Sequence, residues 1–273
     1  KIFPLSSHKN SLILSCNENG YVQTYFSDRY GFNNPDYEWE TKEVDYLIIG
    51  DSFAEGHCVN RPFDYASQLR IKNNNVITLG VGRNGPLNKY ATLVEYGKLI
   101  KVKNIIWMYF EGNDVSDLIR EVEHPILKSY INIPNFTQNL ALKTNHIDNI
   151  ANNNFLRWKD HNQRLDVITK TSFLTKTKKI LSLTSLRLFI INNFLTKTKI
   201  NTDEIIINKN HLNNFNEIIK LINNFSTQQQ AKLYFVYLPS YLRYHLQLEN
   251  DNDYKNYIEI KEFIKSKKIG RAH

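Results

Sequence analysis

The chain has little cysteine: Cys16 and Cys58 are the only two among 273 residues. Two cysteines permit one disulfide at most and support no metal site, so they do not decide the redox compartment. No hydrophobic stretch reaches the length of a membrane span. The remaining composition, with 41% hydrophobic and 23% charged residues, is typical of a globular protein with one sizeable core, with or without a large insertion.

Acidic residues are missing between Val167 and Thr202, although this stretch carries seven lysines and arginines. Those seven account for nearly all of the net charge of +8, because the rest of the chain has 28 basic and 27 acidic residues. The simplest interpretation is a solvated helical cover. Apolar residues from Leu186 to Phe194 make a lid, or contact with a membrane surface through 170–200, the best functional alternative. Nucleic acid is not expected as a partner, because aromatic residues are not interleaved with the lysines.

The pattern of apolar residues predicts strands that alternate with helices after residues 1–43, an aromatic, turn-rich lead-in that we expect to pack on the core. We expect strands at 46–49, 75–79, 104–110 and 232–238, and helices over 62–72, from Pro86, through 212–225 and over 254–267. Such alternation is typical of a parallel sheet with helices on both faces, so residues 44–273 are predicted to form one α/β domain, a three-layer α/β/α sandwich.

Two features interrupt this regular pattern. About ninety residues separate the third predicted strand from the helix before the fourth, which is too long for a simple crossover. We interpret residues from about 116 to 204 as a helical insertion. The chain also stops where a fifth strand is expected, so we expect the last strand of the sheet to be missing or incomplete.

Three loops leave the carboxyl ends of consecutive predicted strands, and they present Ser52, Gly82 and Asn113. Because the ends of parallel strands lie side by side, we expect these residues to converge. A serine hydroxyl that attacks an ester creates an oxyanion, and the Ser52 N–H, the Gly82 N–H and the Asn113 side-chain amide can each donate to it. Gly82 has to lack a side chain so that its N–H can approach the substrate oxygen.

The tripeptide Gly50-Asp51-Ser52, a glycine after the second strand and the tripeptide Gly112-Asn113-Asp114 resemble blocks I, II and III of the SGNH, or GDSL-type, hydrolases. The resemblance covers about residues 44–115 by motif, and the α/β pattern extends it to about 267. It implies a flavodoxin-like SGNH hydrolase fold, with Ser52 as nucleophile and with Gly82 and Asn113 completing the oxyanion hole.

The lead-in strengthens this resemblance. The stretch from Asp28 to Asp36, followed by Trp39, is similar to the lead-in of an exported bacterial subgroup associated with modification of surface polysaccharides. The resemblance implies an acylated small molecule or a polysaccharide as substrate. It favours an exported, periplasmic or membrane-anchored protein over a cytoplasmic one.

The family's fourth block, an Asp-x-x-His that supplies the general base and its orienting carboxylate, is missing after the fourth predicted strand. His273 is preceded three positions earlier by Gly270, and His245 comes too soon after the strand. We infer that the sequence lacks its C-terminal end or is a defective copy. Without the base, Ser52 is only a weak nucleophile at neutral pH, so a defective copy is expected to be inactive.

The sequence does not favour a dinucleotide site or a metal site. Gly80-x-Gly82-x-x-Gly85 is a literal dinucleotide fingerprint, but it follows the second strand rather than the first and runs directly into Pro86. Asp51 and Asp114 stand at strand ends, yet a metal would need several converging oxygen ligands. We interpret both carboxylates as braces for the loop backbone, and we predict neither a cofactor nor a metal.

The resulting hypothesis is a serine ester hydrolase of the carbohydrate or acyl esterase type, with O-acetyl groups of a cell-envelope glycan as a substrate suggested by family association. A first alternative is an O-acyltransferase, in which a sugar hydroxyl resolves the same acyl-enzyme. A second alternative, from another class, is a catalytically inactive glycan-binding or scaffold domain.

Overall fold

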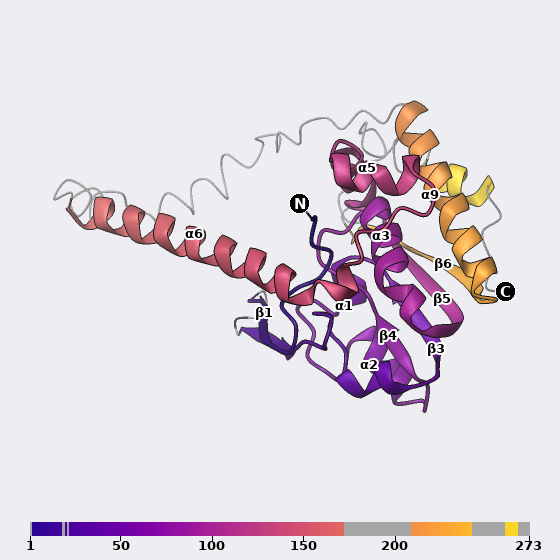
Figure 1. Ribbon diagram of the computed structural model, residues 1–273, viewed down its shortest axis with the longest axis horizontal. Helices are drawn as coiled ribbons and strands as arrows, with labels where there is room; N and C mark the ends of the chain where they lie inside the picture. Colours follow the sequence, from indigo (N-terminus) through magenta and orange to yellow (C-terminus); the bar gives the residue numbers. More distant parts are fainter. Residues whose placement is uncertain (1, 18–19, 21, 172–208, 242–259, 267–273) are drawn as a thin grey trace. The chain divides into compact units, whose positions relative to one another are not determined.

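The computed structural model describes residues 2–17, 20, 22–171, 209–241 and 260–266 (Figure 1). The chain divides into two compact units, one formed by residues 1–148 and 206–273 and the other by residues 149–205. Helix α6 (Thr144–Thr171) runs from the first unit into the second. The predicted membrane contact through 170–200 lies outside the described residues from 172 onward.

Four parallel strands form the central sheet, in the order β4-β3-β5-β6. Their bounds are Glu43–Ile49 for β3, Val76–Thr78 for β4, Lys101–Phe110 for β5 and Lys232–Leu238 for β6. Ile48 of β3 lies in register with Thr78 of β4 and with Ile106 of β5. The predicted parallel sheet is confirmed, and the protein has an α/β fold.

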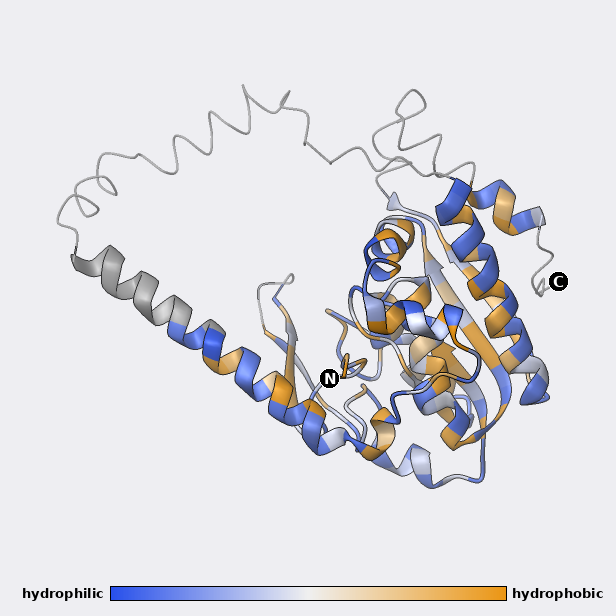
Figure 2. Ribbon diagram, turned by 45° about the horizontal axis from the view of Figure 1, so that its top comes forward, coloured by the Kyte–Doolittle hydropathy of each residue, from blue (hydrophilic) through white to orange (hydrophobic). Residues whose placement is uncertain are grey.

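One face of the sheet carries the larger hydrophobic core. Leu47 and Trp107 point to this face, where they pack with residues of α3 (Pro86–Tyr96) and α9 (Lys209–Gln228). Figure 2 shows hydrophobic residues along the central strands and mixed hydrophobic and hydrophilic faces on the surrounding helices. This pattern is expected of helices that bury one stripe against a sheet.

The opposite face carries a smaller core, because successive strand residues point to opposite sides. Ile48 and Met108 pack there against Ala54 and Ala66. These two alanines belong to α1 (Ser52–Glu55) and α2 (Tyr65–Arg70). Helices therefore cover both faces of the sheet.

The helix predicted over 62–72 begins later than expected. Asp64 is its N-cap and accepts a hydrogen bond from the Ser67 N–H at 2.9 Å, so α2 begins at Tyr65. Phe63, which the predicted range of 62–72 includes, precedes the helix and is 74% exposed, so the predicted start of this helix is wrong. The capping aspartate overrides the apolar spacing. Of the last predicted helix, residues 260–266 are helical and the rest lies outside the described residues.

The lead-in folds around the buried carboxylate of Asp28. Strands β1 (Leu12–Cys16) and β2 (Gln23–Phe26) form an antiparallel hairpin before it, and the short helix η1 (Asp36–Glu40) follows it. The Asp28 carboxylate accepts hydrogen bonds from four donors at 2.8–2.9 Å: the N–H groups of Tyr30 and Phe32, Asn34 Nδ2 and Trp39 Nε1. Burial nevertheless raises the pKa of Asp28, and the four donors oppose that rise.

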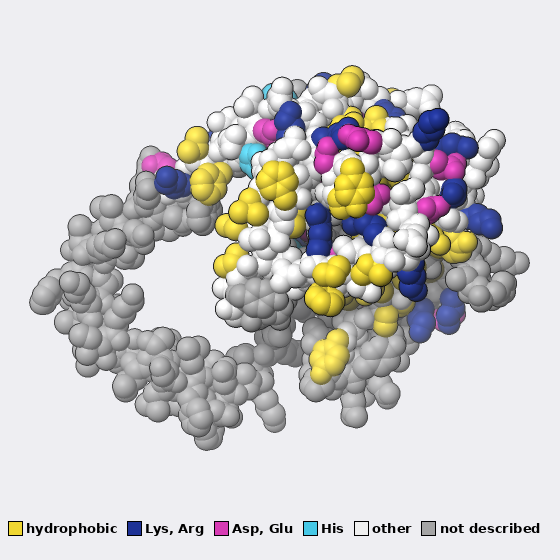
Figure 3. All heavy atoms as spheres, turned by 90° about the horizontal axis from the view of Figure 1, so that it is seen from below, with side chains coloured by type: hydrophobic (Ala, Val, Ile, Leu, Met, Phe, Trp, Pro, Cys, Tyr) yellow, Lys and Arg dark blue, Asp and Glu magenta, His cyan; other side chains and the backbone are white. Residues whose placement is uncertain are grey.

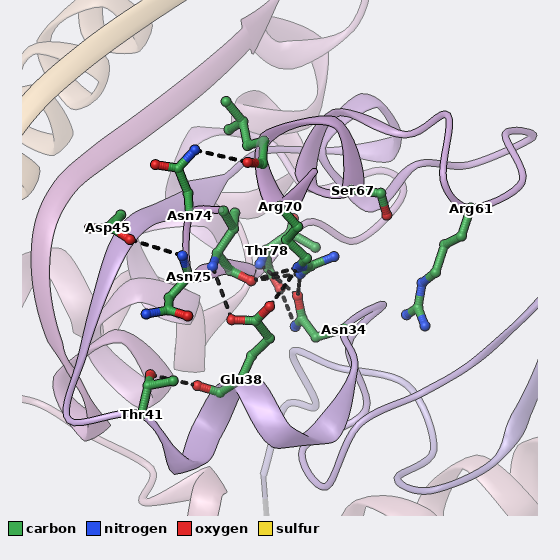
Figure 4. Close-up of polar contacts among 12 residues, drawn as sticks. Asn34, Glu38, Thr41, Asp45, Arg61, Ser67, Arg70, Asn74, Asn75 and Thr78 are labelled. Atoms are coloured by element: carbon green, nitrogen blue, oxygen red, sulfur yellow. Dashed lines mark hydrogen bonds and ion pairs between the residues drawn. The ribbon is translucent and has the colours of Figure 1, made fainter. Parts of the chain in front are cut away.

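Polar side chains join the lead-in to the sheet (Figure 4). Asn34 donates to the Thr78 carbonyl at 2.9 Å and accepts from the Thr78 N–H at 2.8 Å, so it pairs with the edge strand β4. Glu38 of η1 binds Arg70 of α2 at 3.1 Å in a nearly buried ion pair. Residues 1–43 therefore fix the positions of β4 and of α2.

Part of the predicted insertion packs on the α/β core. Helices α4 (Asp114–Glu121) and α5 (Pro125–Asn132) and the short helix η3 (Leu140–Leu142) belong to the first unit. The buried carboxylate of Glu95, on α3, accepts from the Tyr130 hydroxyl at 2.6 Å and from the Leu140 N–H at 2.8 Å. Residues 116–148 are thus held to the core by buried polar contacts.

Charged side chains of opposite sign lie beside one another on the face of the molecule drawn in Figure 3. Arg29–Asp36 at 2.6 Å and Lys103–Asp45 at 2.8 Å are ion pairs of this kind. Within the described ranges, no helix combines the length and the apolar character that a bilayer-spanning segment needs.

Candidate active site

Ser52 stands at the carboxyl end of β3, where the strand turns sharply into α1. Asp51 is the N-cap of α1, and its side chain accepts a hydrogen bond from the Phe53 N–H at 3.0 Å. Gly50 allows the turn because a Cβ there would lie 2.5 Å from the Cβ of Ala54. Ser52 is partly exposed, and within the described residues its hydroxyl makes no hydrogen bond. The local sequence thus presents an accessible hydroxyl.

The loop after β4 lies against α1. A Cβ on Gly80 would be 2.2 Å from the Glu55 backbone nitrogen, so only glycine fits there. A Cβ on Gly82 would be 3.9 Å from the Ser52 Cβ. The structure therefore brings Ser52 and Gly82 together at one end of the sheet.

The Gly82 N–H is already engaged by Glu55, a residue that the sequence analysis did not single out. It donates to Glu55 Oε2 at 2.7 Å. The Tyr25 hydroxyl, from β2, donates to the other carboxylate oxygen at 3.0 Å. Burial raises the pKa of Glu55, while these two donors and nearby His57 lower it in part. Glu55 holds the N–H group that was predicted to face the substrate.

Asn113 follows β5 and precedes α4, at the same end of the sheet. Its Oδ1 is buried and makes no hydrogen bond, and its side chain does not cap α4. Asn113 lines a cavity together with Arg83, the neighbour of Gly82 in the sequence. The third predicted residue is thus placed beside the loop of the second, with an unpaired side-chain oxygen.

A buried ion pair lies beneath these loops. Lys89 Nζ, on α3, is 2.5 Å from Asp114 Oδ2, and both side chains are fully buried. Burial raises the pKa of Asp114 to about 8, against the opposing effect of the Lys89 ammonium. Asp114 also accepts from the Phe110 N–H at 3.3 Å. Both Asp51 and Asp114 therefore brace loop backbone, as the sequence predicted.

Glu121, on α4, binds backbone N–H groups at the amino-terminal end of α3. It accepts from the N–H groups of Gly85 at 2.6 Å, Leu87 at 2.9 Å and Asn88 at 3.2 Å. Burial raises the pKa of Glu121 to about 7, and these three donors oppose the rise. A dinucleotide fingerprint would offer the same N–H groups to a pyrophosphate. In this protein they bind a carboxylate of the chain itself.

Within the described residues, no hydrogen bond joins a histidine ring to the Ser52 hydroxyl. His57 Nδ1 lies 2.8 Å from Ser15 Oγ and 3.9 Å from Glu55 Oε2. His124 lines the cavity beside Asn113. His245 and His273, discussed above as candidates for the fourth block, lie outside the described residues.

The disulfide between Cys16 and Cys58 ties β1 to the loop that follows α1. Gln23 Nε2 donates to the Val59 carbonyl in the same loop, at 2.7 Å. These two cysteines and His57 form the group of three potential metal-ligating side chains found among the described residues, but both thiols are in the disulfide. The hairpin is therefore anchored to the segment that follows α1.

The described part of the chain thus holds a partly exposed serine, a glycine beside it and an asparagine that follows the neighbouring strand, with buried carboxylates close to these loops. Such an arrangement can bind an acyl ester and stabilise negative charge on its carbonyl oxygen once N–H donors are free. Comparison with protein-family models and with curated protein sequences finds no match to this chain.

Proposed function

We propose that this protein is a serine ester hydrolase of the SGNH type. The observation that carries the proposal is the apposition of Ser52 and Gly82, where a glycine Cβ would lie 3.9 Å from the serine Cβ. Both residues stand at the carboxyl ends of adjacent parallel strands, where open α/β sheets place their ligands. The order of the three blocks, each after its own strand, supports the same assignment.

In the proposed reaction the Ser52 hydroxyl attacks the acyl carbon, and an alcohol leaves. Water then releases the acid from the acyl-enzyme. The Ser52 N–H and the Asn113 side-chain amide donate to the oxyanion. The Gly82 N–H joins them only when Glu55 releases it, because that N–H is bound to the carboxylate at 2.7 Å in this structure. Each such donor contributes about 3 kcal/mol to the transition state.

The proposed substrate is an O-acylated glycan outside the cytoplasm. A structural disulfide persists in oxidising compartments, so the Cys16–Cys58 bond supports an exported or periplasmic location. Acyl transfer to a sugar hydroxyl would use the same acyl-enzyme. Supplying an acyl donor with and without an acceptor sugar, and measuring the acid against the acylated sugar, separates hydrolysis from transfer.

Active-site labelling tests the proposal directly. A fluorophosphonate probe should label the protein stoichiometrically, and Ser52→Ala should abolish the labelling. Ser67→Ala is a matched control, since Ser67 is a buried serine on the neighbouring helix α2. Labelling that survives Ser52→Ala would contradict the role of Ser52.

A second candidate is a catalytically inactive glycan-binding domain. It is favoured by the Gly82 N–H being held by Glu55. Absence of both fluorophosphonate labelling and acetyl ester hydrolysis, together with measurable glycan binding, would favour this candidate over the hydrolase.

A further inference from the structure

A cavity of about 570 Å³ adjoins Asn113. It is lined by residues of four segments: Phe3 of the lead-in, Arg83 and Asn88 around the start of α3, Asn113 to Glu121 at the start and along α4, and His124 and Leu127 at the start of α5. Nothing in the proposed chemistry at Ser52 uses these residues, apart from Asn113.

Four polar side-chain atoms in the lining have no hydrogen-bond partner in the described part of the chain, and each can accept a hydrogen bond, His124 Nδ1 in the tautomer protonated at Nε2. Asn88 Oδ1, Asn113 Oδ1, Asp117 Oδ2 and His124 Nδ1 are all buried and unpaired. Asn88 is 8% exposed and Asp117 is 4% exposed, so both side chains are more than nine-tenths buried. Buried acceptors are normally paired, because an unpaired one is costly to remove from water. Their gathering around one cavity indicates a ligand that supplies donors.

The charges in the lining restrict the kind of donor. Arg120 is bound to Asp117, and Glu121 is committed to three backbone N–H groups. Arg83 also lines the cavity and forms no hydrogen bond or ion pair with a described side chain, so its positive charge disfavours an ammonium group there. The acceptors, in turn, repel a carboxylate. Neutral hydroxyl groups satisfy both conditions, because each donates one hydrogen bond without bringing charge.

The positions of the acceptors also favour hydroxyl groups as the ligand's donors. The acceptors come from α3, from the N-cap and first turn of α4, and from the residue that precedes α5, so three elements contribute them to one cavity. In the described part of the chain, Asp117, Glu121 and His124 are not among the side chains whose ligand atoms cluster within 4.8 Å. One ion could not reach them together. The Phe3 ring, 4.5 Å from the His124 ring, adds an apolar surface of the kind that packs on a sugar face.

We propose that this cavity binds a saccharide ring through its hydroxyl groups, which donate to Asn88, Asn113, Asp117 and His124. The further assignment of this sugar as the alcohol part of the ester cleaved at Ser52 rests on the proposed function. Sugar binding itself does not. Asn113 connects the cavity with the proposed reaction site. It lines the cavity, and it follows β5, the strand that pairs with β3, which leads to Ser52.

The first test is binding of unesterified sugars to the intact chain. Saturation-transfer NMR with the methyl glycosides of glucose, galactose, mannose and N-acetylglucosamine should detect at least one binder, and calorimetry should give its Kd. Asn88→Leu, which keeps the volume and removes the acceptor, should weaken that binder at least tenfold. Asn213→Leu, the same change at an exposed position of α9, should leave its Kd unchanged.

A second variant guards against a folding defect at Asn88. Asp117→Asn keeps the shape of the side chain, and it should also weaken the sugar at least fivefold while circular dichroism shows a folded protein. Failure of all four glycosides to bind would overturn the proposal. So would binding that neither Asn88→Leu nor Asp117→Asn weakens.

The two proposals can fail separately. If a sugar binds and Asn88→Leu abolishes the binding, while fluorophosphonate labelling is absent, the cavity assignment stands and the hydrolase assignment falls. If Ser52 is labelled but no sugar binds, the cavity assignment falls alone. For an active enzyme, Asn88→Leu should raise KM for an acetylated glycoside at least tenfold and change kcat by less than threefold.

Discussion

At the scale of single residues, Glu55 decides what the Gly82 N–H can do. Its carboxylate takes that N–H at 2.7 Å and the Tyr25 hydroxyl at 3.0 Å, and it is 8% exposed. A buried carboxylate with two donors gives up either donor only at a cost. The loop of Gly82 is therefore held against α1 by a side chain three positions after Ser52.

The contact between Tyr25 and Glu55 should be measurable as a coupling. Tyr25→Phe removes one donor and should lower the free energy of unfolding by about 1–3 kcal/mol, because it leaves a buried carboxylate oxygen unpaired. Glu55→Ala removes both contacts and should cost more. In the double variant the Tyr25→Phe change should cost much less than in the wild type, as measured by urea unfolding in a double-mutant cycle. Additive effects would contradict a direct contact.

The sequence could predict Ser52 and Gly82 but not Glu55. A glycine and a serine after two consecutive parallel strands have to lie near each other, since the strand ends are neighbours. Glu55 lies only one helical turn from Ser52, and that spacing was the one signal for it. Which N–H group its carboxylate would reach depends on how closely Gly80 packs on α1, and this is a property of the folded loops.

At the scale of elements, Glu121 joins α4 to the start of α3. Its partners lie 33–36 residues away in the sequence, so no local pattern could reveal the contact. The strands and α3 were predictable because apolar runs and Pro86 mark them. The start of α2 was not predictable in this way, because Asp64 caps the helix and leaves Phe63 before it and exposed. Long-range polar contacts thus fix how predictable elements are assembled.

Glu121 should make stability depend on pH. Its pKa rises from 4.5 to about 7 on folding, because burial disfavours the charge. The folded chain therefore holds a proton that the unfolded chain has lost between these values, and the free energy of unfolding falls as pH rises through this window. The loss should reach about 3 kcal/mol and level off above the folded pKa.

Glu121→Gln provides the reference, because glutamine does not titrate. The free energy of unfolding of the wild type and of Glu121→Gln is measured by urea at pH 5, 6, 7 and 8. The wild type should lose stability relative to Glu121→Gln from pH 5 to 7, and the difference should then stay constant. A difference that does not change with pH would show that Glu121 keeps its ordinary pKa in the folded protein.

At the scale of the whole molecule, the lead-in is built into the α/β core. The Asp28 carboxylate binds several groups of the lead-in, Asn34 pairs with β4, and the Cys16–Cys58 disulfide ties the hairpin to the segment that follows α1. The sequence predicted that residues 1–43 pack on the core. It left the disulfide open, because a separation of 42 residues does not show whether two cysteines meet.

Removing this disulfide should cost stability throughout the first unit. For a closed loop of about 40 residues, the lost restraint on the unfolded chain corresponds to about 4 kcal/mol. Cys16→Ser/Cys58→Ser should therefore unfold at lower urea concentration than the oxidised wild type and match the wild type in reductant. Equal midpoints for the double variant and the oxidised wild type would show that the bond adds no stability.

The position of Asn113 has a consequence for how specificity can change over evolutionary time. One carboxamide serves both the reacting carbonyl and the sugar pocket in the proposals above, since it stands at the end of β5 and lines the cavity. A substitution there would alter turnover and preference together. Divergence toward new glycans should therefore accumulate at Arg83 and His124, which border the pocket without flanking the nucleophile, while Asn113 stays constant among active relatives.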